Sequence, residues 1–399
     1  MDGKITIEEL DQLWHHHHAQ WRDPLQVTSL WSDAAPLDRT LLRYSVSGRW
    51  WELLEEAQIT LLVTREYEHL VMAMGAREGK PYLSYMRLPH PSGIAVDLNQ
   101  GSVYLASTRN PNQVIRLRPV IGSMDRLDMP YGDDLPERSL VPVSTIFVPG
   151  CLYMHDLAMI GGQLHANSVG QNAVIHLEPD GQHRRVWWPR CIEQDGAPVF
   201  GQNHLQLNSI AAGADLESSY FSASLDHISP RRPGHKNFPV DGRGVIFSGA
   251  TREVMARGLT RPHSARLYRD RVWVDNSGYG ELGYIDSGAL TVTARLPGWT
   301  RGLAFHAGIA FVGTSRVIPR FRQYAPGLDV ESSVCGVHAV HLDSGEVLGS
   351  ILWEYGNQIF AIEAVPMAFA SGFPFLVNHP RATEREKRLF YTFTWERDA

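Results

Sequence analysis

Two histidines, an asparagine and an arginine occupy the same place in a phrase that recurs along the chain. The phrase is one polar residue followed by a short, mostly apolar run, and its copies are Ser92-Gly93-Ile94, His155-Asp156-Leu157, Asn208-Ser209-Ile210, His263-Ser264-Ala265 and Arg301-Gly302-Leu303, with a degraded sixth at Phe360-Ala361-Ile362. Imidazole and amide groups can hold a divalent metal such as zinc and leave positions open for water or substrate. A guanidinium binds an anionic group through two hydrogen bonds. If the copies converge, they form one polar site.

The phrase also predicts the elements that would bring these residues together. Each copy enters a short strand, and further strands follow after Gly, Asp-Gly or Ser-Gly turns. The clearest unit places four strands in the segments 264–268, 271–275, 282–286 and 290–296. Four antiparallel strands per repeat are typical of a β-propeller blade, whose first strand lines the central channel. Equivalent positions of different blades then become neighbours at the channel mouth.

The fold class that follows is all-β, a roughly six-bladed β-propeller with a short helical N-terminal preface. The strand-like segments 59–64, 70–74 and 82–88 come before the first phrase, and we expect them to complete the blade that begins near Phe360 and so to close the ring. We predict a helical extension at 1–57, the propeller at 58–371 and a C-terminal tail packing on it at 372–399. Segments 119–150 and 315–335 could each add a strand, and 229–244 is expected to be a long loop over one face.

Composition excludes several classes of function. The formal net charge is -6, from 37 basic and 43 acidic residues, so no basic surface for nucleic acid is expected. No apolar run is long enough to cross a membrane, and the three cysteines are far apart, which favours a soluble protein of the reducing cytoplasm. Motifs for a Ser nucleophile elbow, a phosphate loop, a dinucleotide fold or an HExxH zinc site are missing from the sequence.

Several phrases together resemble an uncharacterised bacterial family of conserved hypothetical β-propeller-like proteins, some of them fused to tetratricopeptide repeats. The segments that carry this resemblance are 88–97, 155–158, 262–264, 276–283 and 301–306, and it covers about residues 59–368. The resemblance implies no activity. It does imply a histidine at the position where this chain has Gln206. His204 lies two residues earlier, on the same side of an extended strand, and could substitute for that histidine.

We therefore predict a metal-dependent lyase, hydrolase or isomerase that acts on a small acidic molecule or peptide at the channel mouth. The predicted metal ligands are His155, His263, and His204 or Gln206, for zinc, iron, copper or manganese; the predicted catalytic residues are Arg301, Asn208 and Asp156. The alternative is a scaffold that binds a protein or glycan, with the histidines bonding neighbouring blades through buried waters. The run His15 to His18 could chelate a metal or form a solvated tract.

Overall fold

Short antiparallel strands make up most of the chain. The structure is a computed structural model that describes residues 37–377, except 110, 111, 121, 124–137, 230, 232, 236 and 237, together with the isolated positions 8, 12, 393 and 394. Six sheets of four or five strands form the body. Four of them have their strands in the order in which the chain visits them; the other two each contain an edge strand from elsewhere in the sequence, β1 (Tyr44–Gly48) beside β27 (Val347–Trp353) and β28 (Ile362–Pro366) beside β2 (Ile59–Arg65). The predicted six-bladed β-propeller is confirmed.

The six blades follow one another along the chain. Blade 1 contains β2 (Ile59–Arg65), β3 (Leu70–Arg77), β4 (Lys80–Arg87) and β28 (Ile362–Pro366); blade 2 contains β5 (Pro91–Asp97), β6 (Ser102–Ser107), β7 (Gln113–Pro119) and β9 (Leu140–Phe147); blade 3 contains β10 (Met154–Ile160), β11 (Gln163–Ser168), β12 (Ala173–Leu177) and β13 (His183–Trp187). Blade 4 contains β16 (Leu207–Ala211), β17 (Tyr220–Ala223), β18 (Gly244–Ser248) and β19 (Val254–Leu259); blade 5 contains β20 (Pro262–Tyr268), β21 (Arg271–Asn276), β22 (Glu281–Asp286) and β23 (Ala289–Arg295); blade 6 contains β24 (Trp299–His306), β25 (Ile309–Ser315), β26 (Cys335–His341) and β27 (Val347–Trp353).

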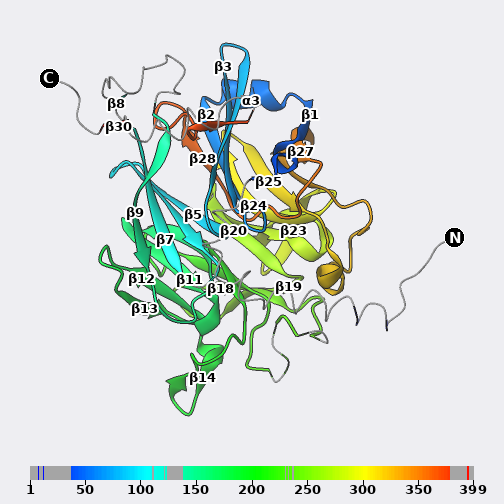
Figure 1. Ribbon diagram of the computed structural model, residues 1–399. Helices are drawn as coiled ribbons and strands as arrows, with labels where there is room; N and C mark the ends of the chain where they lie inside the picture. The colour runs from blue at the N-terminus through cyan, green and yellow to red at the C-terminus, as the bar shows by residue number, and fades with distance from the viewer. Residues whose placement is uncertain are drawn as a thin grey trace.

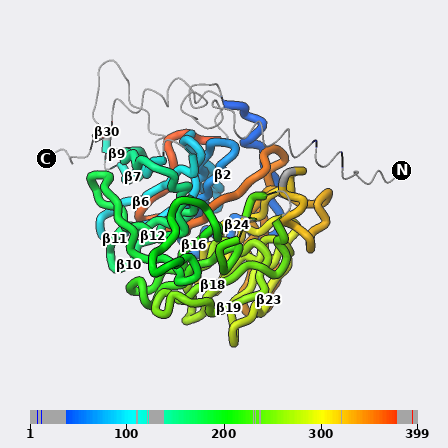
Figure 2. Tube along the Cα trace, turned by 90° about the horizontal axis from the view of Figure 1, so that it is seen from below, coloured from blue at the N-terminus to red at the C-terminus, as the bar shows by residue number. Residues whose placement is uncertain are grey.

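The ring closes through strands from the two ends of the propeller sequence. Strand β28 pairs antiparallel with β2, in the register Ile59 to Pro366 through Val63 to Ile362. In Figure 1 the red-orange strand β28 lies beside the blue strand β2, and in Figure 2 the chain colours pass in order around the molecule. Because both ends of the propeller share blade 1, the ring has no open sheet edge at its junction. The predicted closure is confirmed.

Turn chemistry explains why the outer strands fold back so tightly. Between β22 and β23 only Ser287 and Gly288 separate the paired residues Asp286 and Ala289. Their φ angles are 50° and 82°, the positive pair that a two-residue turn of the hairpin type requires. Such a turn matches the right-handed twist of the strands on either side, so it fixes the register of the outer hairpin.

Apolar side chains fill the wedges between neighbouring blades. Trp187 of blade 3 packs on Phe221 of blade 4, with ring centroids 4.0 Å apart, and both are buried. Closer to the channel the blades approach through small residues: a Cβ added at Gly93 would lie 2.5 Å from the Cα of Asp156. This glycine is therefore needed for the contact between blades 2 and 3.

Residues 37–57 differ in part from the predicted helical preface. Helix α3 (Trp50–Glu56) lies where a helix is expected, and it buries Trp50, Leu53 and Leu54 against the propeller. However, β1 (Tyr44–Gly48) is a strand that pairs with the outer edge of blade 6 through β27. That free edge offers hydrogen-bond partners which local periodicity does not reveal, and so a helix is not formed there. The run His15 to His18 lies outside the described residues.

The remaining elements are short. They are η1 (Arg39–Leu42), η2 (Val169–Gln171), η3 (Arg190–Ile192), η4 (Ser277–Tyr279) and η5 (Pro319–Tyr324), the hairpin β14 (Glu193–Gln194) with β15 (Ala197–Pro198), the pair β8 (Gly122–Ser123) with β30 (Phe393–Thr394), and β29 (Phe375–Leu376) on the edge of β4. Segment 119–150 supplies the outer strand β9 of blade 2, whereas 315–335 supplies η5 and no additional strand. The exact boundaries of the three predicted regions stay a prediction. In the part of the chain that the structure describes, no helix is long and apolar enough to span a membrane.

Candidate functional site

Four ring positions of the repeated phrase line one cavity at the channel mouth. The cavity has a volume of about 760 Å³, and His155, His263, Arg301 and Phe360 all line it. They come from the entrances of the inner strands of blades 3, 5, 6 and 1. The predicted convergence of equivalent repeat positions is therefore observed for these residues. The other two ring positions, Ser92 and Asn208, lie buried behind them.

A β-bulge in the inner strand of five blades aims the ring side chains. The register between first and second strands shifts at Pro91 to Ile94, Met154 to Leu157, Leu207 to Ser209, His263 to Arg266 and Thr300 to Leu303. A bulge bends a strand and breaks the simple alternation of its side chains. In blades 5 and 6 the bulge includes a positive φ, 53° at Ser264 and 88° at Gly302. The polar-then-small pattern of the phrase thus encodes the bulge.

A belt of side-chain hydrogen bonds holds the six entrances in place. At every junction between blades one side chain donates to a backbone carbonyl at the start of the next blade: Thr64 Oγ1 to Ser92 O (2.7 Å), Ser92 Oγ to Met154 O (2.7 Å), Asn167 Nδ2 to Leu207 O (2.6 Å), Asn208 Nδ2 to Pro262 O (2.9 Å), Ser277 Oγ to Thr300 O (2.6 Å) and Ser315 Oγ to Ile359 O (3.2 Å). Buried backbone carbonyls need such partners. The belt therefore orders the ring before any ligand binds.

His155 is a neutral imidazole beside a guanidinium. Its Nδ1 lies 3.5 Å from Nη2 of Arg301, and its ring meets the Phe360 ring edge to face at 5.4 Å. Burial, and then the positive charge of Arg301, hold the pKa of His155 well below its usual 6.5. Asn208 acts in the opposite direction, because its side chain hydrogen-bonds the ring. At neutral pH His155 can therefore accept a proton rather than carry one.

His263 is fixed in one tautomer. Its Nδ1 lies 2.8 Å from the carbonyl oxygen of Arg261 and 2.8 Å from Ser277 Oγ, whose own proton goes to Thr300 O. A carbonyl oxygen only accepts, so Nδ1 carries the proton and Nε2 is the unprotonated nitrogen. Burial, and then Arg301, hold the pKa of this side chain well below 6.5. Only 2% of His263 is exposed, so its orientation is set by the protein.

Arg301 is a partly buried guanidinium that no carboxylate among the described residues neutralises directly. Its Cζ lies 3.3 Å from the centroid of the Phe360 ring, which supports the flat face of the group. Burial lowers its pKa to about 10. Among the described residues no Asp or Glu forms an ion pair with Arg301. Of the groups that raise its pKa, Glu66 has the largest effect, and Gln358 lies between the two side chains with a contact to each.

Sequence reasoning missed the charged residues that flank the ring. Glu66, Arg109 and Arg316 line the cavity from the turns that follow the second strands of blades 1, 2 and 6. A second strand ends on the face where the first begins, because the two are antiparallel. The position after each second strand was therefore a signal that could have found them.

A second set of residues lies two positions before the ring positions, and of these only Gln206 was predicted from the sequence. Here His90, Tyr153, Gln206 and Arg261 have positive φ angles of 40°, 49°, 50° and 55°. Residues other than glycine rarely adopt this conformation, and it recurs at functional sites. Tyr153, Gln206 and Arg261 line the cavity, whereas His90 does not. Of the predicted segment 229–244, Pro233 and Gly234 also line it.

Besides Asn208, two further predicted residues do not line the cavity. His204 is buried behind it, with its backbone N–H donating to Asn172 Oδ1 at 2.8 Å. Asp156 points to the channel interior, where it accepts two hydrogen bonds from Arg266, at 2.7 and 3.1 Å, and one from Ile210 N at 3.0 Å. Because the Asp156 carboxylate is fully engaged there, the site chemistry below does not use it.

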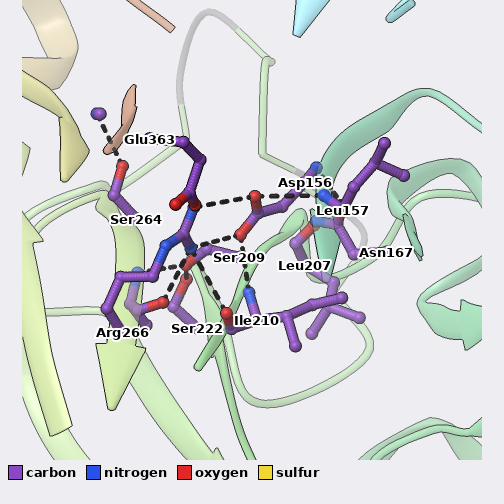
Figure 3. A network of polar contacts seen from close by, with 12 residues as sticks. Asp156, Leu157, Asn167, Leu207, Ser209, Ile210, Ser222, Ser264, Arg266 and Glu363 are labelled. Carbon is purple, nitrogen blue, oxygen red and sulfur yellow. Dashed lines mark hydrogen bonds and ion pairs between the residues drawn. The ribbon is translucent and has the colours of Figure 1, made fainter. Parts of the chain in front are cut away.

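The interior of the channel is closed by an ion triad below the cavity. Figure 3 shows the guanidinium of Arg266 between the carboxylates of Asp156 and Glu363. The distance from Arg266 Nη2 to Glu363 Oε1 is 3.7 Å. The three residues come from β20, β10 and β28, that is from blades 5, 3 and 1. Arg266 thus links three alternate blades across the channel.

The predicted metal ligands do not assemble into a metal centre. His204 lies outside the cavity, and the Oε1 atom of Gln206 accepts a hydrogen bond from Arg261. Within the described ranges, no three His, Cys, Asp or Glu side chains are placed so that they could hold a metal ion. The guanidinium groups of Arg261 and Arg301 also lower the pKa of His263, and the same positive charge would oppose a divalent cation. These donors suit an anion better than a metal.

Comparison with known proteins identifies the family. Residues 48–371 match the family model of a domain of unknown function, DUF4915, and the chain belongs to this family. The predicted membership of an uncharacterised propeller family is thereby confirmed, while fusion to tetratricopeptide repeats stays a prediction. No curated protein sequence matches the chain.

Solved structures resemble the chain at low sequence identity. One is a nidogen/laminin complex, with 10% identity and a TM-score of 0.49 over 77% of this chain and 98% of that one. A protein of unknown function from Bacteroides caccae has 10% identity and a TM-score of 0.48, over 77% and 98%. A gluconolactonase from Xanthomonas campestris has 13% identity and a TM-score of 0.44, over 75% and 86%. Similarity of this degree carries no conclusion about activity.

Proposed function

We propose that the protein binds a small acidic molecule at Arg301 and acts on it by proton transfer. The observation that carries the proposal is the state of Arg301, a partly buried guanidinium at a cavity wall with no carboxylate as its ion-pair partner among the described residues. A buried charge without a counterion is costly, and a bound anion would supply one. Phe360 packs on the flat face of the guanidinium, and His155 and Gln358 engage two of its five N–H groups, so N–H donors remain for an anion.

Proton transfer is the chemistry that the neighbouring imidazole supports. His155 is neutral at pH 7 and lies beside the atom that would hold the anion, so it can accept a proton from a bound molecule. The resulting imidazolium would be close to the anion, which stabilises it. Hydrolases, lyases and isomerases all use such a step, and the class among these three remains part of the proposal.

A metal-free site is the form of this proposal that the side chains favour. Elemental analysis separates it from the predicted metal-dependent form. The measurement uses the chain purified without an added affinity tag, with His15 to His18 replaced by Ser, because that run can hold metal on its own. We expect less than about a tenth of an equivalent of zinc, iron, copper or manganese. One equivalent that is lost in His263→Ala would contradict the metal-free form.

Calorimetric titration tests anion binding itself. The probes are 3-phenylpropionate and inorganic phosphate, and the variants are Arg301→Gln and, as a control, Arg184→Gln, whose side chain is 65% exposed on the outer strand β13. Loss of a charge-assisted hydrogen bond costs about 1.5–3 kcal/mol, so we expect at least one probe to bind about 10- to 100-fold more weakly to Arg301→Gln. The control should bind as the wild type does. Equal binding to Arg301→Gln and wild type would refute the proposal.

A further inference from the structure

Glu66 gives the cavity a negative group opposite Arg301. It is the one carboxylate among the described lining residues, and only 3% of it is exposed. Its Oε1 accepts a hydrogen bond from Thr108 Oγ1, and it forms a long ion pair with Arg109 Nε at 3.9 Å; His90 Nδ1 lies 3.9 Å from the same oxygen. A carboxylate has about four acceptor positions, so Glu66 keeps acceptor capacity for a ligand.

One amide sets the spacing between Glu66 and Arg301. With its side-chain amide oriented to suit both neighbours, Gln358 donates from Nε2 to Glu66 Oε2 at 2.8 Å and accepts from Arg301 Nη1 at 3.3 Å. Since amide oxygen and nitrogen are only one carbon apart, the charged atoms of the two residues are no more than roughly 8 Å apart. Gln358 is 7% exposed, so this arrangement is fixed by packing.

Two opposite charges at this spacing discriminate between ligands. A simple anion gains the attraction of Arg301 and suffers the repulsion of Glu66, and for a simple amine the two effects are reversed. A molecule that carries a carboxylate and an ammonium group a few bonds apart is attracted at both ends. The cavity wall next to these charges is aromatic, with Trp299, Tyr324 and Phe360. Apolar side chains of a ligand can pack on such a wall.

We propose that the ligand is an amino acid, held with its carboxylate on Arg301 and its ammonium group on Glu66. The inference rests on the proposed function, since it takes anion binding at Arg301 as given. It adds a positively charged group to the proposed ligand, and it makes Glu66 a residue that determines specificity. The aromatic wall receives the side chain of the amino acid.

Three probes with one carbon skeleton test the inference. They are L-phenylalanine, 3-phenylpropionate, which lacks the ammonium group, and 2-phenylethylamine, which lacks the carboxylate. Calorimetric titrations compare the full chain with Glu66→Gln and with the control Glu178→Gln, a carboxylate that is 42% exposed on the outer face of blade 3. We expect the wild type and the control to bind L-phenylalanine at least about 10-fold more tightly than either of the other probes.

The Glu66→Gln variant should invert this preference. The amide keeps an oxygen for Thr108 but loses the charge, so binding of L-phenylalanine should fall about 10-fold and that of 3-phenylpropionate should rise. A role in packing alone would instead weaken all probes by the same factor, which would overturn the inference. Binding of 3-phenylpropionate through Arg301 without a preference for L-phenylalanine would overturn it and leave the proposed function standing. Absence of binding by all three probes would count against both.

Discussion

Removal of Arg266 should expose how strongly the channel triad holds the propeller together. In the variant Arg266→Met the apolar chain fills much of the same space, but the Asp156 carboxylate loses the two hydrogen bonds of the guanidinium. Only 5% of that carboxylate side chain is exposed, so water cannot replace the lost partner. It keeps the backbone donors of Ile210 and Leu157, at 3.0 and 3.1 Å. The variant therefore contains a buried, partly satisfied charge.

The size of the effect follows from that burial. Removal of one partner from a buried ion pair costs about 3–5 kcal/mol, because the other charge remains without compensation. The double variant Asp156→Asn with Arg266→Met removes both charges, while the Asn oxygen can still accept from Ile210. We expect the double variant to lose no more than about 2 kcal/mol relative to the wild type, because replacement of a whole buried pair is often nearly neutral. The expected loss for Arg266→Met alone exceeds that of the double variant by at least about 1–3 kcal/mol, so the two substitutions should couple by at least this amount.

Urea unfolding followed by tryptophan fluorescence at pH 7 and 25 °C measures all four proteins of this cycle. The free energies of unfolding are compared only if they depend on urea concentration with the same slope, since a changed slope would signal a different unfolding reaction. A loss below about 1 kcal/mol for Arg266→Met would refute the assignment of the triad as a cross-channel link, and so would simple additivity of the two single variants.

Two further predictions concern the same framework. Burial raises the pKa of Glu363 to about 7. The folded chain then holds more protons than the unfolded chain between pH 4.5 and 7, so the free energy of unfolding falls as the pH rises through this window. Relative to the wild type, Glu363→Gln should gain about 3 kcal/mol of stability between pH 4.5 and 8, and unfolding curves with equal pH dependence for the two proteins would contradict this. Replacement of Ser277 by Ala removes the donor to Thr300 O and a partner of His263 Nδ1. We expect this to lower the free energy of unfolding by about 1–3 kcal/mol, measured by thermal or urea unfolding. A loss under about 0.5 kcal/mol would show that the belt does not order the ring.

The repeated phrase predicted the inner strands because it encodes local geometry. A polar residue, a small residue and an apolar pair are what a bulged inner strand needs, so the entrances of five blades follow from the phrase. The degraded sixth copy at Phe360 and the strand-like segments before the first copy predicted the closure of β28 on β2, although β28 has no bulge. The hairpin turns carry their own signal in pairs such as Ser287-Gly288. Helix α3 also follows its periodicity, since its apolar residues face the propeller.

Other parts of the site and fold could not be predicted from the sequence, because they depend on contacts between distant parts of the chain. Asp156 is next to His155 in sequence, yet it belongs to the triad because Arg266, 110 residues away, reaches it across the channel. Glu66 and Arg109 lie in turns outside the phrase, and only the antiparallel return of the second strand brings them to the cavity. The strand β1 likewise depends on the free edge of β27, which no local pattern reveals.

A crystal structure of the chain grown with 3-(4-bromophenyl)propionate would test the central claim most directly, because the bromine atom locates the compound by anomalous scattering. The account predicts the carboxylate on the guanidinium edge of Arg301, beside His155 and within the cavity. Bromine sites confined to the outer surface, with Arg301 paired to a carboxylate of the protein itself, would contradict it.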